Sequence, residues 1–403
     1  MPTRILAVAL TLPWASATFL AAILYGASVL PQAKESSALA SRLASLDLEG
    51  RAAQVLLAGV EGARLPSPAT LSLLKSMPLG GVVLLGSNLT GDPIDAGRFT
   101  SALQAASAPI PLIVAIDHEG GLVFRFKGEG ITRVPPPAEV GKKGAGYSYA
   151  LGRAAGSELR ALGINMALAP VVELLTDDNR AFLGTRSYGS SAEATDAAAG
   201  AYIEGLQSEL VASVAKHFPG NAGEDPHRVL PELRLSLREY ERDYAPRFSN
   251  AIGRRVSAIM LSHVVFKALD PERPSSLSPA VVGGELRGRL GFRGLVLTDD
   301  VGMRALAAGR GPGESAVEAL AAGADLVMVV DMDSAPSVRD AIVRAVKDGR
   351  LPASRLEQAT RRVLELKSRF RMGEAFDLPA REKALSGFPG LVRENAKRLS
   401  GFL

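Results

Sequence analysis

The residues best suited to chemistry lie between positions 214 and 231, in the stretch VAKHFPGNAGEDPHRVLP. A mostly apolar run over 210–215 ends at Lys216 and His217, and a loop punctuated by Gly and Pro follows. A short apolar run bounded by turn residues predicts a buried strand. Because an isolated buried charge is costly, packing explains a cation and an imidazole at this point poorly. A binding or catalytic site at the strand end explains them better.

The same loop carries a carboxylate and an imidazole, Asp225 and His227, with only Pro226 between them. Proline stiffens the backbone, and an Asp near a His can orient the ring and stabilise its protonated form. The competing interpretation is a polar surface loop with a chance histidine. The chain has only four histidines, however. Three follow apolar strand-like runs and His227 lies in the loop after one, a distribution that favours a site.

Composition excludes several other kinds of chemistry. The 403 residues carry a formal net charge of +4 and include no cysteine, which excludes disulfides, thiolate nucleophiles and Cys-based zinc sites. Lys and Arg form no clustered stripe with interleaved aromatic residues, so nucleic acid is not an expected partner. The carboxylates and histidines lack a metal-ligand spacing such as HExxH. We therefore expect neither a metal nor a cofactor.

From Leu46 onwards, apolar runs alternate with helical patterns. After a helix and a short apolar segment at 47–59, the predicted strands cover 80–85, 111–116, 164–173, 210–215, 256–261, 294–298 and 325–330, and the predicted helices cover 68–77, 95–107, 147–162, 192–209, 240–253, 314–323 and 351–367. Continuous apolar strands between helices indicate a parallel sheet covered on both faces. Roughly seven or eight such units suit a single (β/α)8 TIM-like barrel.

A doubly wound open sheet is the alternative architecture. The first predicted strand is not followed by GxGxxG, and no GxxxxGK[ST] phosphate loop occurs, so nucleotide binding loses support. In a barrel, catalytic groups lie at the carboxyl ends of strands, where Asp117, His118, Lys216, His217, His263, Asp299 and Asp300 fall. Asp300 is expected to cap the following helix. His263 either lines the pocket or is a buried, hydrogen-bonded structural residue.

The N-terminus contains a long uncharged span. No charge occurs between Arg4 and Lys34, and 5–30 is mostly apolar. The span exceeds the ~20 residues that cross a bilayer, whereas Pro13 and the small residues at 15–17 favour a cleaved signal. We weigh three interpretations for 1–31: a signal anchor, a signal peptide and a buried helix. The first two direct the catalytic domain to the periplasm or exterior, with 32–45 as a tether, and the anchor makes the membrane a partner.

Several motifs, taken in order, resemble family 3 glycoside hydrolases, and in particular their single-domain β-N-acetylhexosaminidase branch. The resemblance covers about 46–373 and leaves 374–403 as a C-terminal tail without an assigned function. It rests on GGVVLLGSN, AIDHEGGLVFRF, ALGINMALAPVVEL with GTRSYG, KHFPG, EDPHRVLP, AIMLSHVVF with LSPAVV, and GLVLTDDVGM. Each motif alone is weak, and their agreement in order makes the resemblance specific.

The resemblance implies a role for each candidate residue. By position in the last motif Asp299 is the nucleophile, and Asp225 with His227 forms the acid/base dyad. The sugar-binding residues are Asp117, Arg125, Arg186, Lys216 and His217. Two positions depart from the usual family pattern, because Asn221 stands where His is usual and His118 where Gln is more usual. The catalytic loop is also slightly shorter.

The residues themselves agree with this chemistry. Cleavage with retention needs a nucleophile and a proton donor on opposite sides of the glycosidic bond. Asp299 can form the glycosyl ester, and an imidazole, which ordinarily titrates near pH 6.5, can give and later take a proton. The expected activity is a retaining exo-β-N-acetylglucosaminidase that acts on GlcNAc-containing muropeptides. The alternatives are a phosphorylase that uses the same site and a degenerate, membrane-anchored sugar-binding barrel.

Overall fold

The computed structural model describes residues 39–307 and 309–402. The chain divides into two units, Met1–Ser45 and Leu46–Leu403. In the first unit the described residues form a short helical segment at 39–44. The predicted signal or anchor at 1–31 and most of the tether at 32–45 lie outside the described residues. Within the described part of the chain, no helix combines the length and the apolar character that a membrane span requires.

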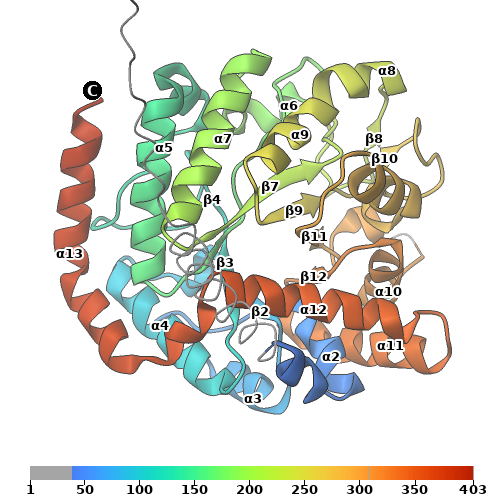
Figure 1. Ribbon diagram of the computed structural model, residues 1–403, viewed down its shortest axis with the longest axis horizontal. Helices are drawn as coiled ribbons and strands as arrows, with labels where there is room; N and C mark the ends of the chain where they lie inside the picture. The colour runs from blue at the N-terminus through green and yellow to red at the C-terminus, as the bar shows by residue number, and fades with distance from the viewer. Residues whose placement is uncertain (1–38, 308, 403) are drawn as a thin grey trace, which may run out of the picture. The chain divides into compact units, whose positions relative to one another are not determined.

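Eight parallel strands of the second unit close into a barrel (Figure 1). They are β1 (Leu56–Gly59), β2 (Gly81–Leu84), β3 (Ile113–Ile116), β6 (Met166–Ala167), β7 (Ala212–Phe218), β9 (Ala258–Leu261), β11 (Leu295–Asp300) and β12 (Leu326–Val329). Because β1 pairs with β2 on one side and with β12 on the other, the sheet has no free edge. The predicted (β/α)8 barrel is confirmed, and the open sheet was the wrong alternative.

Alternation along each strand divides its apolar residues between two layers. Ile113 and Ala115 of β3 belong to the cluster that fills the barrel, whereas Val114 and Ile116 pack in the outer cluster beneath the helices. Successive strand side chains point to opposite faces, and both faces of a barrel strand are covered. This double burial is the physical reason why the strands read as continuous apolar runs.

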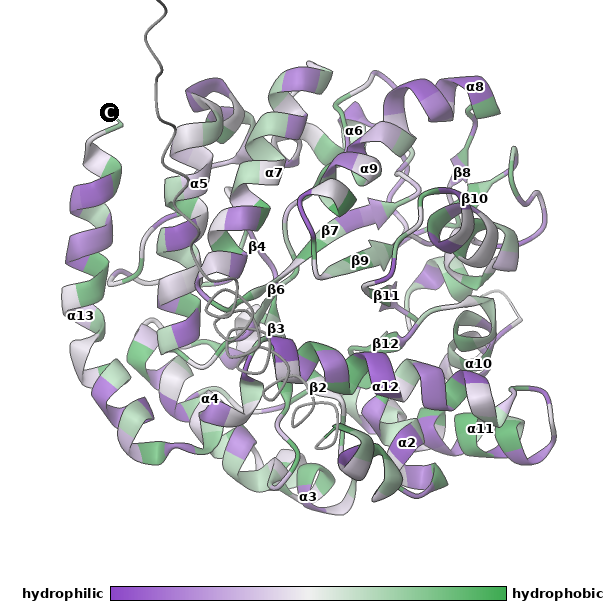
Figure 2. Cartoon of the chain, viewed as in Figure 1, coloured by the Kyte–Doolittle hydropathy of each residue, from purple (hydrophilic) through white to green (hydrophobic). Residues whose placement is uncertain are grey.

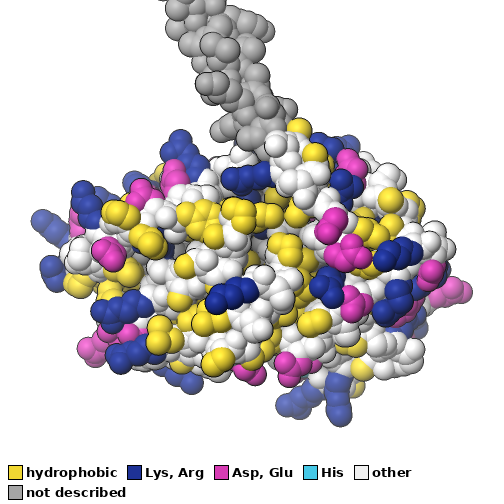
Figure 3. Space-filling view, turned by 90° about the horizontal axis from the view of Figure 1, so that it is seen from below, with side chains coloured by type: hydrophobic (Ala, Val, Ile, Leu, Met, Phe, Trp, Pro, Cys, Tyr) yellow, Lys and Arg dark blue, Asp and Glu magenta, His cyan; other side chains and the backbone are white. Residues whose placement is uncertain are grey.

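An outer layer of helices covers the barrel. The longer helices are α3 (Pro68–Ser76), α4 (Pro93–Ser107), α5 (Pro137–Ala161), α7 (Ala192–Ser208), α9 (Ala245–Gly253), α10 (Pro312–Ala322), α11 (Ala335–Lys347), α12 (Ala353–Arg369) and α13 (Leu378–Ser400), and the shorter α2 (Leu48–Gln54) precedes β1. Hydrophilic and hydrophobic residues alternate along them (Figure 2), as in helices that cover a core on one side. On the face in Figure 3, basic and acidic side chains are interspersed.

The α12 helix closes the amino-terminal end of the barrel. Its Val363 and Leu366, together with Phe370, join the interior cluster. Two of its arginines, Arg355 and Arg362, form ion pairs of 3.0 and 2.9 Å with Asp325, which is fully buried at the start of β12. These contacts hold the helix across the strand starts and leave the carboxyl ends of the strands open for a site.

Several predicted boundaries were wrong for identifiable reasons. The strand predicted at 164–173 is only Met166–Ala167, and Pro170, which has no N–H to donate, separates it from a single further bridge between Val171 and Lys216. The strand predicted at 210–215 extends to Phe218, so Lys216 and His217 lie within β7 and not beyond it. The helix predicted at 147–162 corresponds to the second part of α5, and a kink at Gly144 separates it from a helix that begins at Pro137 and was not predicted.

The C-terminal tail consists largely of one helix. Residues Leu378–Ser400 form α13, although Pro389 lies inside it. The helix packs against α5 and α4, as Figure 1 shows for α5. Phe388 is buried in this contact, and the Asn395 side chain donates a 2.9 Å hydrogen bond to Glu158 of α5. The α11 helix was also absent from the predicted elements.

Phe370→Ala tests the closure of the barrel by α12. Removing a buried ring from the interior cluster leaves a cavity, so the free energy of unfolding is expected to fall by about 3–5 kcal/mol. Leu378→Ala is the control, because Leu378 is more than half exposed and should change stability by less than about 0.5 kcal/mol. Urea unfolding of both variants measures the difference. Equal midpoints for Phe370→Ala and the parent would contradict the packing described here.

Candidate active site

A buried cluster of charges occupies the carboxyl end of the barrel. The Lys216 ammonium on β7 lies 2.8 Å from Asp117 and 2.7 Å from Glu119, two carboxylates that follow β3. Arg125, one residue past the antiparallel hairpin β4 (His118–Gly120) and β5 (Val123–Phe124), donates to Asp117 over 2.6 Å. Arg186, after the short helix α6 (Arg180–Leu183), binds Glu119 through two nitrogens at 2.8 and 2.9 Å. The predicted sugar-binding charges therefore converge.

Electrostatics keeps every member of this cluster ionised. Burial alone would raise the pKa of Asp117 and Glu119, but the positive charge of Lys216 acts on both carboxylates with an arginine beside each. The net pKa of Glu119 falls to about 2, and that of Asp117 falls far below its usual range. Burial would lower the pKa of Lys216, but the two carboxylates raise it. Charged donors and acceptors are thus present at neutral pH for binding sugar hydroxyls.

His217 is oriented by a carboxylate that sequence reasoning missed. Glu173, buried just after β6, accepts hydrogen bonds from the backbone N–H and from Nδ1 of His217, both at 3.0 Å. Glu173 also accepts hydrogen bonds from the backbone N–H of Asn221 at 2.6 Å and from its side-chain amide at 2.9 Å. Asn221 Nδ2 also lies 2.9 Å from Nδ1 of His217, so Glu173 and Asn221 together hold the imidazole ring in place. Asn221 also anchors the start of the catalytic loop.

The two other histidines of the strand ends are both buried. His263 is buried, accepts a hydrogen bond on Nδ1 from Ser276 at 2.8 Å and donates Nε2–H to the Asp300 carbonyl at 3.0 Å. Burial lowers its pKa and keeps it neutral. His118 packs 4.9 Å from the ring of Phe124, and burial lowers its pKa to about 4. Of the two interpretations of His263, the structure therefore supports the hydrogen-bonded one.

Asp299 and Asp300 end β11 and have different surroundings. Asp299 is half-buried, and its Oδ1 accepts a hydrogen bond from the backbone N–H of Asp300 at 2.9 Å. Asp300 accepts the backbone N–H groups of Val330 and Gly302, at 3.0 and 3.2 Å, and burial raises its pKa. The expectation that Asp300 caps a helix was wrong, since it ties β11 to the end of β12. Asp299 is left as the carboxylate available for chemistry.

The dyad predicted in the catalytic loop is formed. Asp225 accepts both the backbone N–H and the Nδ1–H of His227, at 2.9 and 2.7 Å from the same oxygen. Burial would raise the pKa of Asp225, but these hydrogen bonds lower it overall. The His227 side chain is 66% exposed. The Ala305 N–H, in the segment that follows Asp299, donates to the Pro226 carbonyl at 3.2 Å, so the dyad loop and the Asp299 segment are joined.

The sequence contained a partial signal for the missed residues. Glu119 and Glu173 each end or follow an apolar strand-like run, in AIDHE and APVVE, which is where a barrel exposes its functional side chains.

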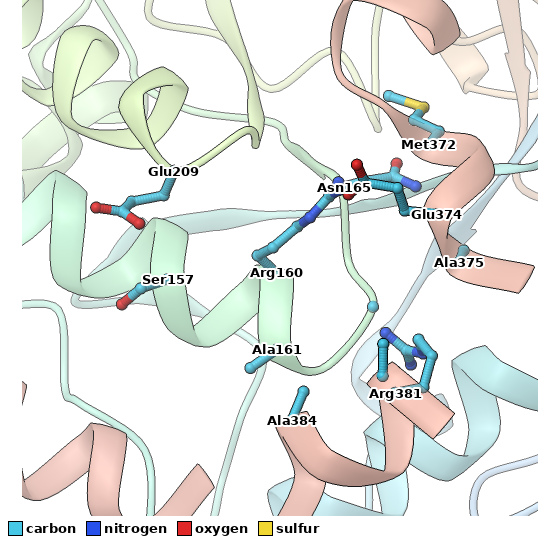
Figure 4. Close-up of a pocket in the computed structure, with 12 residues that line it drawn as sticks. Ser157, Arg160, Ala161, Asn165, Glu209, Met372, Glu374, Ala375, Arg381 and Ala384 are labelled. Carbon is cyan, nitrogen blue, oxygen red and sulfur yellow. Dashed lines mark hydrogen bonds and ion pairs between the residues drawn. The ribbon is translucent and has the colours of Figure 1, made fainter. Parts of the chain in front are cut away.

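Among the described residues no group of three His, Asp or Glu side chains has an arrangement that could hold a metal ion. A cavity lined by Asn165 and Arg381, seen close up in Figure 4, lies at the opposite end of the barrel, since Asn165 precedes β6.

Glu119→Gln tests the buried charge cluster. At pH 7 the free energy of unfolding should fall by about 3–5 kcal/mol, because Lys216 and Arg186 lose a buried partner. The carboxylate has a pKa of about 2 in the folded chain against an ordinary value of 4.5. Its stabilisation is complete above pH 4.5 and disappears as the pH falls towards 2. The gap between variant and parent should therefore narrow over this range.

Urea unfolding at pH 7 and pH 3 measures this gap. Glu365→Gln on α12 is the control, because Glu365 is exposed. Its loss should change the free energy of unfolding by less than about 0.5 kcal/mol at either pH. A Glu119→Gln chain as stable as the parent at pH 7 would show that the cluster does not hold the strand ends together.

Comparisons with known proteins agree with the geometry. Residues 48–366 match the model of the glycosyl hydrolase family 3 N terminal domain. A beta-hexosaminidase of Alkalilimnicola ehrlichii is 34% identical over 303 residues, which cover 73% of this chain and 84% of that one. A beta-hexosaminidase of Stenotrophomonas maltophilia K279a is 34% identical over 309 residues, which cover 73% of this chain and 87% of that one.

Two solved structures share the fold. A family 3 beta-N-acetylglucosaminidase from Paenibacillus sp. superposes with a TM-score of 0.78 at 36% identity, over 81% of this chain and 63% of that one. This chain thus spans less than two thirds of the Paenibacillus protein. A beta-N-acetylhexosaminidase from Beutenbergia cavernae superposes with a TM-score of 0.73 at 30% identity, over 80% of this chain and 99% of that one. With its barrel, its ordered motifs and these relatives, this chain belongs to glycosyl hydrolase family 3 and is a glycoside hydrolase.

Proposed function

We propose that this enzyme is a retaining exo-β-N-acetylglucosaminidase that releases terminal β-linked N-acetylglucosamine from peptidoglycan fragments. The observation that carries the proposal is the Ala305–Pro226 hydrogen bond, which joins the loop of the Asp225–His227 dyad to the segment that follows Asp299. These two segments supply a carboxylate nucleophile and a separate proton donor, the two groups that retention requires.

The first step forms a bond from an Asp299 oxygen to the anomeric carbon and breaks the bond to the leaving oxygen, which takes a proton from His227. In the second step a water molecule gives a proton to His227 and attacks the same carbon, and Asp299 is released. Asp225 holds the proton on Nδ1 and stabilises the imidazolium. The exposure of His227 suits this role, because the leaving group and later the water must both reach it.

The charge cluster suits recognition of a terminal sugar. Lys216, Asp117 and Arg125 form one chain of contacts, and Arg186 extends it through Glu119. Such a continuous set of charged groups can bind the hydroxyls of one sugar ring by charge-assisted hydrogen bonds. The relatives named beta-hexosaminidase and beta-N-acetylglucosaminidase support an N-acetylhexosaminide as this sugar.

An aryl β-N-acetylglucosaminide tests the proposal directly. Release of the aryl group is expected with and without inorganic phosphate, and N-acetylglucosamine should be the sugar product in both. Release only with phosphate would instead identify a phosphorylase. Such a reaction is physically possible, because a neutral imidazole repels phosphate less than a carboxylate would. No release under either condition would identify a sugar-binding barrel that has lost activity.

Asp299→Asn tests the assignment of the nucleophile. Turnover should fall by roughly 10³-fold or more, as for other lost nucleophiles, with the fold and sugar binding retained. Asp300→Asn is the matched control, because Asp300 accepts backbone N–H groups of Val330, just after β12, and of Gly302, in the turn after β11. It should keep most of the activity and lose about 1 kcal/mol of stability. The opposite order of activities would make Asp300 the nucleophile.

His227→Ala tests the assignment of the proton donor. A sugar alkoxide needs a proton to leave, whereas a nitrophenolate leaves readily without one. The variant should therefore cleave a disaccharide about 10²–10⁴-fold more slowly. On a nitrophenyl glycoside the first step should slow much less, so that the variant releases a burst of nitrophenolate. Asp225→Ala should show the same pattern more mildly. Equal losses on both substrates without a burst would assign the acid elsewhere.

We also propose that the uncharged span at 5–30 directs the enzyme to the membrane, with the barrel facing the periplasm or exterior. Its length and the position of Arg4 support this location. Full-length protein should sediment with membranes and resist extraction by high salt. A truncated form that begins at Ser45 should remain in the supernatant and be active. Full-length protein in the cytosol with an intact N-terminus would contradict the location.

A further inference from the structure

A cavity of about 330 Å³ lies at the end of the barrel opposite to the catalytic residues (Figure 4). Its walls come from the end of α5, from the turn η8 (Met372–Phe376) and from the start of α13. The family model ends at residue 366, so two of these three walls follow the part of the chain that it matches. Four alanines and Met372 make much of the lining apolar, and Arg381 is among its polar residues.

Arg381 is a buried cation whose hydrogen-bond partners are all neutral. The residue is 8% exposed. Its Nε donates to Ser101 at 3.2 Å, and its Nη2 donates to the Gly97 carbonyl and to Thr100 at 3.1 and 3.0 Å. Among the described residues its Nη1 has no hydrogen-bond acceptor, and Arg381 lines the cavity. The guanidinium rests against Gly163, where a Cβ atom would lie 2.3 Å from Nη1.

The other charges that line the cavity are already balanced. Arg160 pairs with Glu374 at 2.8 Å, and the third arginine nearby, Arg153, pairs with Glu209. Arg381 therefore carries the one positive charge in the described lining that has no carboxylate. Burial, followed by repulsion from Arg160, lowers its pKa to about 10, so it remains charged at pH 7. A buried cation without a counterion is costly, and an anion in the cavity removes that cost.

We infer that this cavity binds a small organic monoanion, namely a carboxylate on a short apolar chain. The carboxylate accepts a hydrogen bond from Arg381 Nη1, and the apolar chain packs against the alanines and Met372. A single negative charge suits the site better than two, because Glu209 and Glu374 also line the cavity and repel a dianion.

Binding at this place joins three segments of the chain. The ligand contacts α5, η8 and α13 together, and Met372 also belongs to the cluster that fills the barrel. A ligand that binds only the folded chain stabilises it by mass action. Since the cavity lies at the opposite end from Asp299 and His227, its occupation raises the thermal stability and leaves the glycosidase rate unchanged.

The test uses the purified full-length chain with sodium butyrate as the probe, at constant ionic strength set with sodium chloride. Butyramide has nearly the same shape without the charge and is the matched control. Butyrate should raise Tm by a few degrees in a saturable manner, and calorimetry should give a Kd in the millimolar range. Butyramide and chloride should leave Tm unchanged. Equal effects of butyrate and butyramide, or none from either, would overturn the proposal.

Variants then locate the effect. Arg381→Gln should weaken butyrate binding at least tenfold, whereas Lys383→Gln removes an exposed charge from the same helix and should leave the Kd unchanged. Because Arg381 also holds α13 on α4, a second variant keeps it in place. Ala384→Phe fills the cavity, retains the guanidinium and should abolish binding. Butyrate affinity unchanged in Ala384→Phe would show that the anion binds elsewhere.

Discussion

The buried ammonium group of Lys216, held between Asp117 and Glu119, is the contact on which the site depends. Two carboxylates at the end of one strand are tolerated in the interior because a cation from another strand lies between them and an arginine binds each of them. The contact joins β7 to the segment after β3 across the open end of the barrel. It also places Arg125 and Arg186, each of which binds one of the two carboxylates. Groups fixed in this way lose little freedom when a sugar binds.

The two ends of the barrel serve different purposes. At the amino-terminal end, α12 seals the interior with Val363, Leu366 and Phe370, and Asp325 is satisfied by arginines of that helix. At the carboxyl end, β3 is followed by Asp117, and β7 and β11 finish in segments that carry Lys216 and Asp299. This division is general for the architecture, since the end with the longer loops carries the chemistry and the other end carries the stability. The Arg381 cavity is an exception, because it places a guanidinium without a carboxylate partner at the amino-terminal end.

The proposed acid/base dyad differs from the rest of the site in its exposure. Lys216, Glu119 and Glu173 are almost completely buried, whereas His227 is mostly exposed on its loop. A sugar-binding group gains strength from burial, because its hydrogen bonds do not compete with water. A proton donor that must later accept a proton from water needs access to solvent. The Ala305–Pro226 bond keeps the exposed loop beside the Asp299 segment.

The sequence alone determined which residues would be buried in strands and where polar groups would follow them. Apolar runs before Asp117, Lys216 and Asp299 are local patterns, so the barrel and most site residues could be predicted from them. The spacing of Asp225 and His227 is local as well, and the dyad formed as expected. The tertiary structure alone decided which charges pair. Glu119 meets Lys216, and Glu173 meets His217, across separations that no local pattern encodes. These pairs exist because closing the barrel brings distant strand ends into one low-dielectric space, where each charge must find a partner.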